Sequence, residues 1–93
     1  MRLTLARSGG FAGVTMVASL ELSDLPPEEA RSVRRSVHAA PASVPRAVSV
    51  DRFAYDLTVE EKGGRRELHY VEPDIPPGMA VVIEALMARA TIA

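Results

Sequence analysis

The sequence contains no cysteine, which excludes a disulfide framework, a thiolate zinc site and a cysteine nucleophile. It has no tryptophan either, and aromatic residues make up only 4% of the chain. A core must therefore consist mainly of Val, Leu, Ala, Ile and Met. The two histidines, His38 and His69, are far apart in the chain and lack the spacing of a local metal site. We expect no metal and no cofactor.

Long apolar runs and a concentrated basic segment are absent as well. No run approaches the ~18 apolar residues that a membrane-spanning helix needs. The first ten residues, MRLTLARSGG, contain too short an apolar stretch for a secretory signal, because Arg7 interrupts it. The net charge is -1 and the isoelectric point is near 6.1, whereas a nucleic-acid-binding domain usually has a basic face and a high isoelectric point. We therefore expect a protein that binds neither membrane nor nucleic acid and stays in the cytoplasm of a bacterium. A mature chain whose leader has been removed would have the same features.

What the chain does have is the composition of an ordinary globular domain. It contains 93 residues, of which 47% are hydrophobic and 25% charged. A second domain would need roughly 100 residues of its own. The sequence therefore predicts a single domain over residues 1–93, with one small apolar core.

Two alternating segments in the first part of the chain predict a β-hairpin. Residues 2–7 place Leu3 and Leu5 on one face, and the glycines that follow Ser8 are expected to end this strand. Residues 14–22 alternate again, with Val17 as the one apolar exception on the outer face. Their inward residues are Val14, Met16, Ala18, Leu20 and Leu22. The glycine-rich segment between the two strands would connect them.

A helix, a second hairpin and a second helix are expected after this hairpin. Pro27 suits the first position of a helix, and Pro41 would end it; its apolar stripe is Ala30, Val33, Val37 and Ala40.

Residues 41–50 read as a proline-rich linker that becomes a strand near its end. Strands are then predicted over 51–60, with Phe53, Tyr55, Leu57 and Val59 inward, and over 65–71, with Leu68 and Tyr70 inward. A last helix follows Pro76 and Pro77, with Met79, Val82, Ile83 and Leu86 at helical spacing.

This order of elements predicts an α+β fold. Two hairpins would form one four-stranded antiparallel sheet in the order β-β-α-β-β-α, with both helices packed on one face of the sheet. The turn between the last two long strands would be formed by Glu61, Lys62, Gly63 and Gly64.

The titratable residues form no catalytic constellation. His38 falls at the end of the first helix, where a cation is favoured by the helix dipole, and His69 lies on the outward face of a strand, where we expect a cross-strand partner. Asp51 and Asp56 are five residues apart on a strand and so face opposite sides. The basic residues Arg31, Arg34 and Arg35 read as a solvated helix face. We therefore predict that the protein is not an enzyme.

The most unusual segment is Ser8-Gly9-Gly10-Phe11-Ala12-Gly13. A phosphate-binding loop would run into a helix and often carry a lysine, but here a strand follows. Two readings remain. In one, the segment is a loose hairpin loop with Phe11 folded back on the core. In the other, it is a flexible loop that presents Phe11 to a groove in a partner protein.

The sequence resembles the emfourin family of bacterial metallopeptidase inhibitors, which includes the inhibitor of protealysin. The most specific part of the resemblance is Arg7-Ser8-Gly9-Gly10-Phe11-Ala12-Gly13, preceded by the first strand. Further matching features are Leu25 with Glu28 and Glu29 at the helix start, Asp51, Tyr55, Leu57 and Val59 on the third strand, and Ile75-Pro76-Pro77. The resemblance implies a stoichiometric, non-catalytic inhibitor of thermolysin-like zinc metallopeptidases.

For such an inhibitor we expect residues 8–13 to form the main contact, with Phe11 filling an apolar subsite beside the zinc ion of the peptidase. The turn Lys62-Gly63-Gly64 is a second, weaker candidate for the contact. The alternative function is a small protein-binding or dimerisation module with a regulatory role and no peptidase target. It would use the sheet or the apolar last helix, with Met79, Met87 and Ala90. Either protein would be a monomer or a weak dimer.

Overall fold

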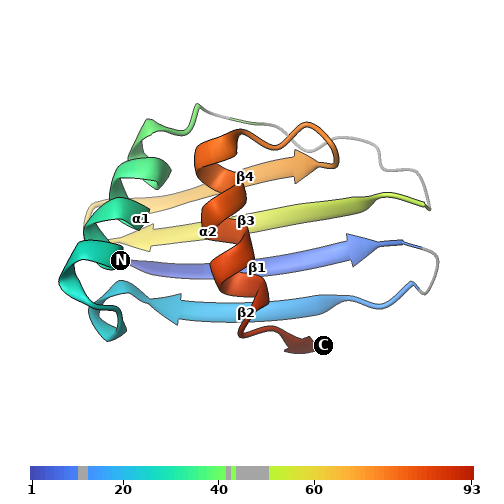
Figure 1. Cartoon of the computed structure of the whole chain (residues 1–93), viewed down its shortest axis with the longest axis horizontal. Helices are drawn as coiled ribbons and strands as arrows, with labels where there is room; N and C mark the ends of the chain where they lie inside the picture. The colour runs from blue at the N-terminus through green and yellow to red at the C-terminus, as the bar shows by residue number, and fades with distance from the viewer. Residues whose placement is uncertain (11–12, 42, 44–50) are drawn as a thin grey trace.

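Two β-hairpins lie side by side in one antiparallel sheet (Figure 1). The computed structural model describes residues 1–10, 13–41, 43 and 51–93. The sheet has the strand order β4-β3-β1-β2-β5, so β1 and β3 are central. The elements in chain order are β1 (Arg2–Gly9), β2 (Met16–Glu21), a 3-10 turn (Leu22–Asp24), α1 (Pro27–Ala39), β3 (Phe53–Glu61), β4 (Gly64–Val71), α2 (Pro77–Met87) and β5 (Thr91–Ile92).

The inward residues of the strands pair with one another across the sheet. Leu5 on β1 pairs with Ala18 on β2 and with Leu57 on β3, and Leu57 in turn pairs with Leu68 on β4. All four side chains are at most 6% exposed. The predicted alternation is confirmed for these residues, because a period of two puts every second side chain on the buried face. The prediction was wrong for Val14, which precedes β2 and is 39% exposed.

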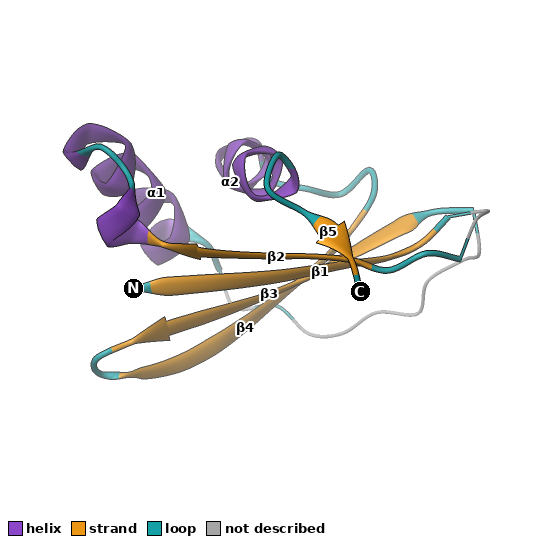
Figure 2. Ribbon diagram, turned by 90° about the horizontal axis from the view of Figure 1, so that it is seen from below, coloured by secondary structure: helices purple, strands orange, loops and turns teal. Residues whose placement is uncertain are grey.

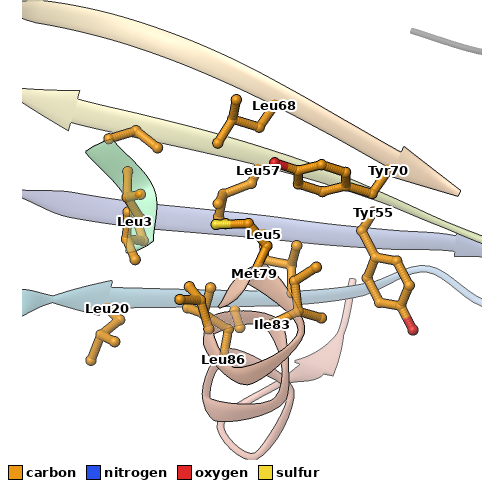
Figure 3. Close-up of a cluster of buried hydrophobic side chains, with 14 of the residues drawn as sticks. Leu3, Leu5, Leu20, Tyr55, Leu57, Leu68, Tyr70, Met79, Ile83 and Leu86 are labelled. Atoms are coloured by element: carbon orange, nitrogen blue, oxygen red, sulfur yellow. The ribbon is translucent and has the colours of Figure 1, made fainter. Parts of the chain in front are cut away.

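Both helices cover the same face of the sheet (Figure 2). α2 contributes Met79, Val82, Ile83 and Leu86, each 5% exposed or less, and Figure 3 shows Met79, Ile83 and Leu86 lying against the leucines of the strands. α1 contributes the fully buried Val37. This arrangement is the predicted α+β architecture. Neither described helix is long and apolar enough to cross a membrane.

The two helices begin as predicted, with Pro27 and Pro77 at the first turn, and neither start has a side-chain cap. The end of α1 is capped by a residue that sequence reasoning missed. The guanidinium of Arg66 on β4 donates to the carbonyl oxygen of Val37 at 3.1 Å and to that of Ala40 at 2.9 Å. Arg66 therefore satisfies two terminal carbonyls of α1 and ties this helix to the sheet.

The prediction of four strands was wrong by one, and the first strand is longer than expected. β5 pairs with β2 through only two residues, Thr91 and Ile92, and such a short strand leaves no periodic pattern in the sequence. β1 continues through Ser8 and Gly9, because these residues pair with Ala54 and Phe53 on β3. The strand expected near the end of residues 41–50 lies outside the described residues.

Two buried tyrosines make the stability of the fold sensitive to alkaline pH. Burial raises the pKa of Tyr70, which Arg66 partly offsets, and burial also raises the pKa of Tyr55. A phenol whose pKa is higher in the folded than in the unfolded chain stabilises the fold fully below the unfolded pKa of about 10. This stabilisation is lost as the pH rises through the folded pKa.

We therefore expect the urea midpoint of unfolding to be lower at pH 11 than at pH 9. The decline in stability should begin at pH ~10, the pKa of tyrosine in the unfolded chain. The hydroxyl of Tyr70 is buried without a hydrogen-bond partner among the described residues, so Tyr70→Phe should cost little or no stability at pH 7. The variant should also show a shallower alkaline decline than the wild type. Equal declines for the two proteins would show that Tyr70 does not contribute to the alkaline effect.

Candidate functional site

The glycine-rich segment lies at the end of the sheet where β1 ends and β3 begins (Figure 1). The N–H of Gly10 donates to the carbonyl oxygen of Arg52 at 3.2 Å, so the chain stays attached to β3 beyond the strand itself. The N–H of Gly13 donates to the carbonyl oxygen of Gly10 at 3.2 Å. Phe11 and Ala12 lie outside the described residues, so neither reading of Phe11 is tested.

Close approach of β3 explains why two of these residues are glycines. Gly9 has a φ of +90°, and a Cβ atom there would lie 2.2 Å from the carbonyl oxygen of Arg52. Gly10 has a φ of +79°, and its Cβ atom would lie 2.7 Å from Cε1 of Phe53. A side chain at either position would collide with β3. These glycines therefore hold the base of the loop against the protein's own sheet.

A stacked pair of side chains completes the base of the loop. The Cζ atom of Arg7 lies 4.1 Å from the centroid of the Phe53 ring, a cation–π distance. Burial, and next the nearby charge of Glu72, raise the pKa of Tyr55, and the positive charge of the Arg7 side chain opposes this rise. Sequence reasoning placed Phe53 on the inward face but did not find its contacts with the loop.

The second candidate, the turn Lys62-Gly63-Gly64, lies at the opposite end of the sheet. β1 and β3 are antiparallel, so Gly9 pairs with Phe53 at one end while Arg2 pairs with Glu60 beside the turn at the other. All three turn residues are exposed. The long axis of the molecule measures 37 Å, and Figure 1 shows the two connections at its two ends. The structure does not bring the two candidates together into one surface.

Both histidines pair with carboxylates. His69 Nδ1 lies 2.7 Å from Asp56 Oδ1, and the two residues are register partners on β4 and β3, which confirms the expected cross-strand partner. His38 Nε2, in the last turn of α1, lies 2.5 Å from Glu61 Oε1 and links this helix to the far end of β3. Among the residues that the structure describes, no group of three or more His, Asp or Glu side chains is placed to hold a metal ion.

The apolar residues at the end of the chain that were named for the alternative function, Met79, Met87 and Ala90, are buried or partly buried. Met79 is 2% exposed, and Met87 and Ala90 are partly buried against the same core. The large apolar side chains exposed in the described part of the chain are Val14, Val81 and Ile92, which belong to three different segments. α2 therefore uses its apolar face to cover the protein's own sheet.

A groove of about 350 Å³ lies between the end of α1 and the start of α2. Among the described residues, the lining includes one charged side chain, Arg35, and no carboxylate or imidazole that would activate Ser36. The remaining lining residues are Ala39, Ala40, Pro41, Pro76, Gly78 and Met79. The described walls of the groove are therefore those of a packing gap between two helices.

The emfourin family model matches residues 5–87, which is most of the chain and includes the glycine-rich segment, β3 and α2. The chain belongs to the emfourin family. Comparisons with curated proteins and with solved structures found no match. The matched range ends before β5, so the fifth strand of this emfourin-family protein lies outside the part that its family model covers.

Proposed function

We propose that this protein is a stoichiometric inhibitor of a thermolysin-like zinc metallopeptidase and has no catalytic activity of its own. The observation that carries the proposal is the emfourin match over residues 5–87, because it spans the glycine-rich segment on which the resemblance depends. In the proposed complex the contact is made by residues 8–13, and the turn at Lys62–Gly64, at the opposite end of a molecule 37 Å long, stays outside it.

The geometry at the base of the loop supports this assignment. An inhibitory loop binds tightly when its ends are already fixed, because less conformational entropy is then lost on binding. Gly9 and Gly10 are attached to β3, and Gly13 is hydrogen-bonded back to Gly10. In the proposed complex Phe11 is the aromatic anchor in the apolar subsite next to the zinc ion, and the sheet is the rigid support behind it.

A titration tests the proposal. Increasing amounts of the protein are added to a fixed, active-site-titrated concentration of a thermolysin-like peptidase, and the residual hydrolysis of a peptide substrate is measured. We expect activity to fall with added protein toward complete inhibition at near-equimolar amounts, while a serine peptidase in a parallel titration is unaffected. Unchanged peptidase activity at a large excess of the protein would contradict the proposed function.

Phe11→Ala is expected to weaken inhibition at least ~30-fold, because aromatic anchors at interface centres typically contribute about 2 kcal/mol or more. The inhibition constant of the variant is compared with that of the wild type. The matched control is Lys62→Ala at the opposite end of the sheet, which should inhibit like the wild type. Unchanged inhibition by Phe11→Ala would contradict the proposal that the loop forms the inhibitory contact.

A further inference from the structure

Phe53 is the aromatic side chain that touches the base of the loop. Its ring lies where a side chain at Gly10 would otherwise be, and Arg7 covers the ring with its guanidinium. Phe53 is half-buried and pairs with Gly9, the last residue of β1. The Phe53 ring therefore lies between Arg7, near the end of β1, and Gly10, the first residue after that strand.

Arg7 is itself restrained by more than the ring. Its Nε atom is buried without a hydrogen-bond partner among the described residues, and its positive charge interacts with the Tyr55 side chain, whose pKa it lowers. An Arg7 conformation that leaves Nε unpaired is favourable only if other contacts compensate, and the stacking on Phe53 is the contact that the geometry provides. Loss of the ring would release Arg7 as well as Gly10.

We infer that Phe53 is a positioning residue for the inhibitory loop: its ring, clamped between Arg7 and Gly10, holds Gly10 in place at the base of the loop before the peptidase binds. The inference rests on the proposed function, which supplies the binding partner. Phe53 acts through the loop and contributes to affinity by reducing the entropy that the loop loses on binding.

The test compares Phe53→Ala with a matched control, Val33→Ala. Val33 is also partly buried against the core, but it lies on α1, away from the glycine-rich segment. We expect Phe53→Ala to inhibit a thermolysin-like peptidase about tenfold or more weakly than the wild type, which corresponds to the loss of a preorganised loop. Val33→Ala should inhibit like the wild type at temperatures where both variants are folded.

A second readout separates positioning from general destabilisation. Amide order parameters of Gly10 and Gly13, measured by nitrogen-15 relaxation, should be near ~0.85 in the wild type and fall toward ~0.6 in Phe53→Ala. They should be unchanged in Val33→Ala. Phe53→Leu, which keeps an apolar side chain on Gly10 but no ring beneath Arg7, should give intermediate values and also serves if Phe53→Ala does not fold.

Unchanged order parameters in the Phe53 variants would overturn the inference, and so would equal losses of inhibition for Phe53→Ala and Val33→Ala. The proposed function fails separately, if the wild-type protein inhibits no thermolysin-like peptidase. In that case the order parameters of Gly10 and Gly13 test the inference by themselves. Lower values in Phe53→Ala would still show that Phe53 restrains the base of the loop, and unchanged values would show that it does not.

Discussion

Gly9→Ala should destabilise the protein by about 3 kcal/mol or more, the largest effect expected for any glycine of the loop. Two independent causes add. The φ of +90° is unfavourable for any residue with a Cβ atom, and that atom would lie 2.2 Å from the carbonyl oxygen of Arg52. Since this oxygen belongs to the backbone, the collision is relieved only by moving the start of β3 away from β1.

Urea unfolding followed by circular dichroism measures the effect, because the chain has no tryptophan to report on unfolding by fluorescence. Two matched controls separate the causes. Gly13→Ala has the unfavourable φ of +64° but open space, so it should cost only ~1–2 kcal/mol. Gly63→Ala meets no atom within 4 Å and should be close to neutral. Equal costs for Gly9→Ala and Gly13→Ala would refute the steric contribution.

The same displacement should weaken inhibition. Gly9 is paired with Phe53, and the Gly10 N–H is bonded to Arg52, so moving β3 disturbs both attachments of the loop. In a peptidase titration at a temperature where the variant is folded, Gly9→Ala should lose more affinity than Gly63→Ala. Wild-type inhibition by a folded Gly9→Ala protein would show that the path of the loop does not matter for binding.

Leu57→Ala is expected to cost ~3–4 kcal/mol, a large share of the total stability of a domain of this size. Leu57 is 1% exposed and lies on the central strand β3, with Leu5 and Leu68 as its two pairing partners. Figure 3 shows Leu57 between Leu5 and Leu68. The cavity left by truncation would open in the middle of the sheet, where neighbouring strands restrict relaxation.

The midpoint of urea unfolding measures this cost, and Val81→Ala is its control. Val81 also lies in a regular element, α2, but is 65% exposed, so truncation should change stability by less than about 0.5 kcal/mol. A Leu57→Ala protein as stable as the wild type would contradict the assignment of the core to this face of the sheet. Because Leu57 is remote from the loop in register, the folded variant should still inhibit.

The periodicity of the sequence was sufficient to predict both helices, both hairpins and the buried face of each long strand. An alternation such as Leu3, Leu5 or Leu57, Val59 allows only one side to face the core. It was not sufficient for β5, whose two residues contain no period, or for the capping of α1 by Arg66, which joins residues from distant segments. The extension of β1 to Gly9 was missed because glycine usually weakens a strand, whereas here pairing with Phe53 retains it.

For the candidate site, composition pointed to the glycine-rich segment but not to the reason for its glycines. That reason is the close approach of Arg52 and Phe53, which lie more than forty positions later in the chain. The large separation between this segment and the Lys62–Gly64 turn follows from the pairing of β1 with β3, and local patterns do not specify which hairpins are neighbours.

The most direct test of the central claim, that the loop end of the sheet contacts the peptidase, is amide chemical-shift mapping. Nitrogen-15-labelled protein is titrated with a catalytically inactivated thermolysin-like peptidase, and each backbone amide signal is followed. We predict the largest shifts or broadening at residues 7–13 and at Arg52 and Phe53, with little change at Lys62, Gly63 and Gly64. Perturbation centred on the Lys62–Gly64 turn, or none at residues 7–13, would contradict the account.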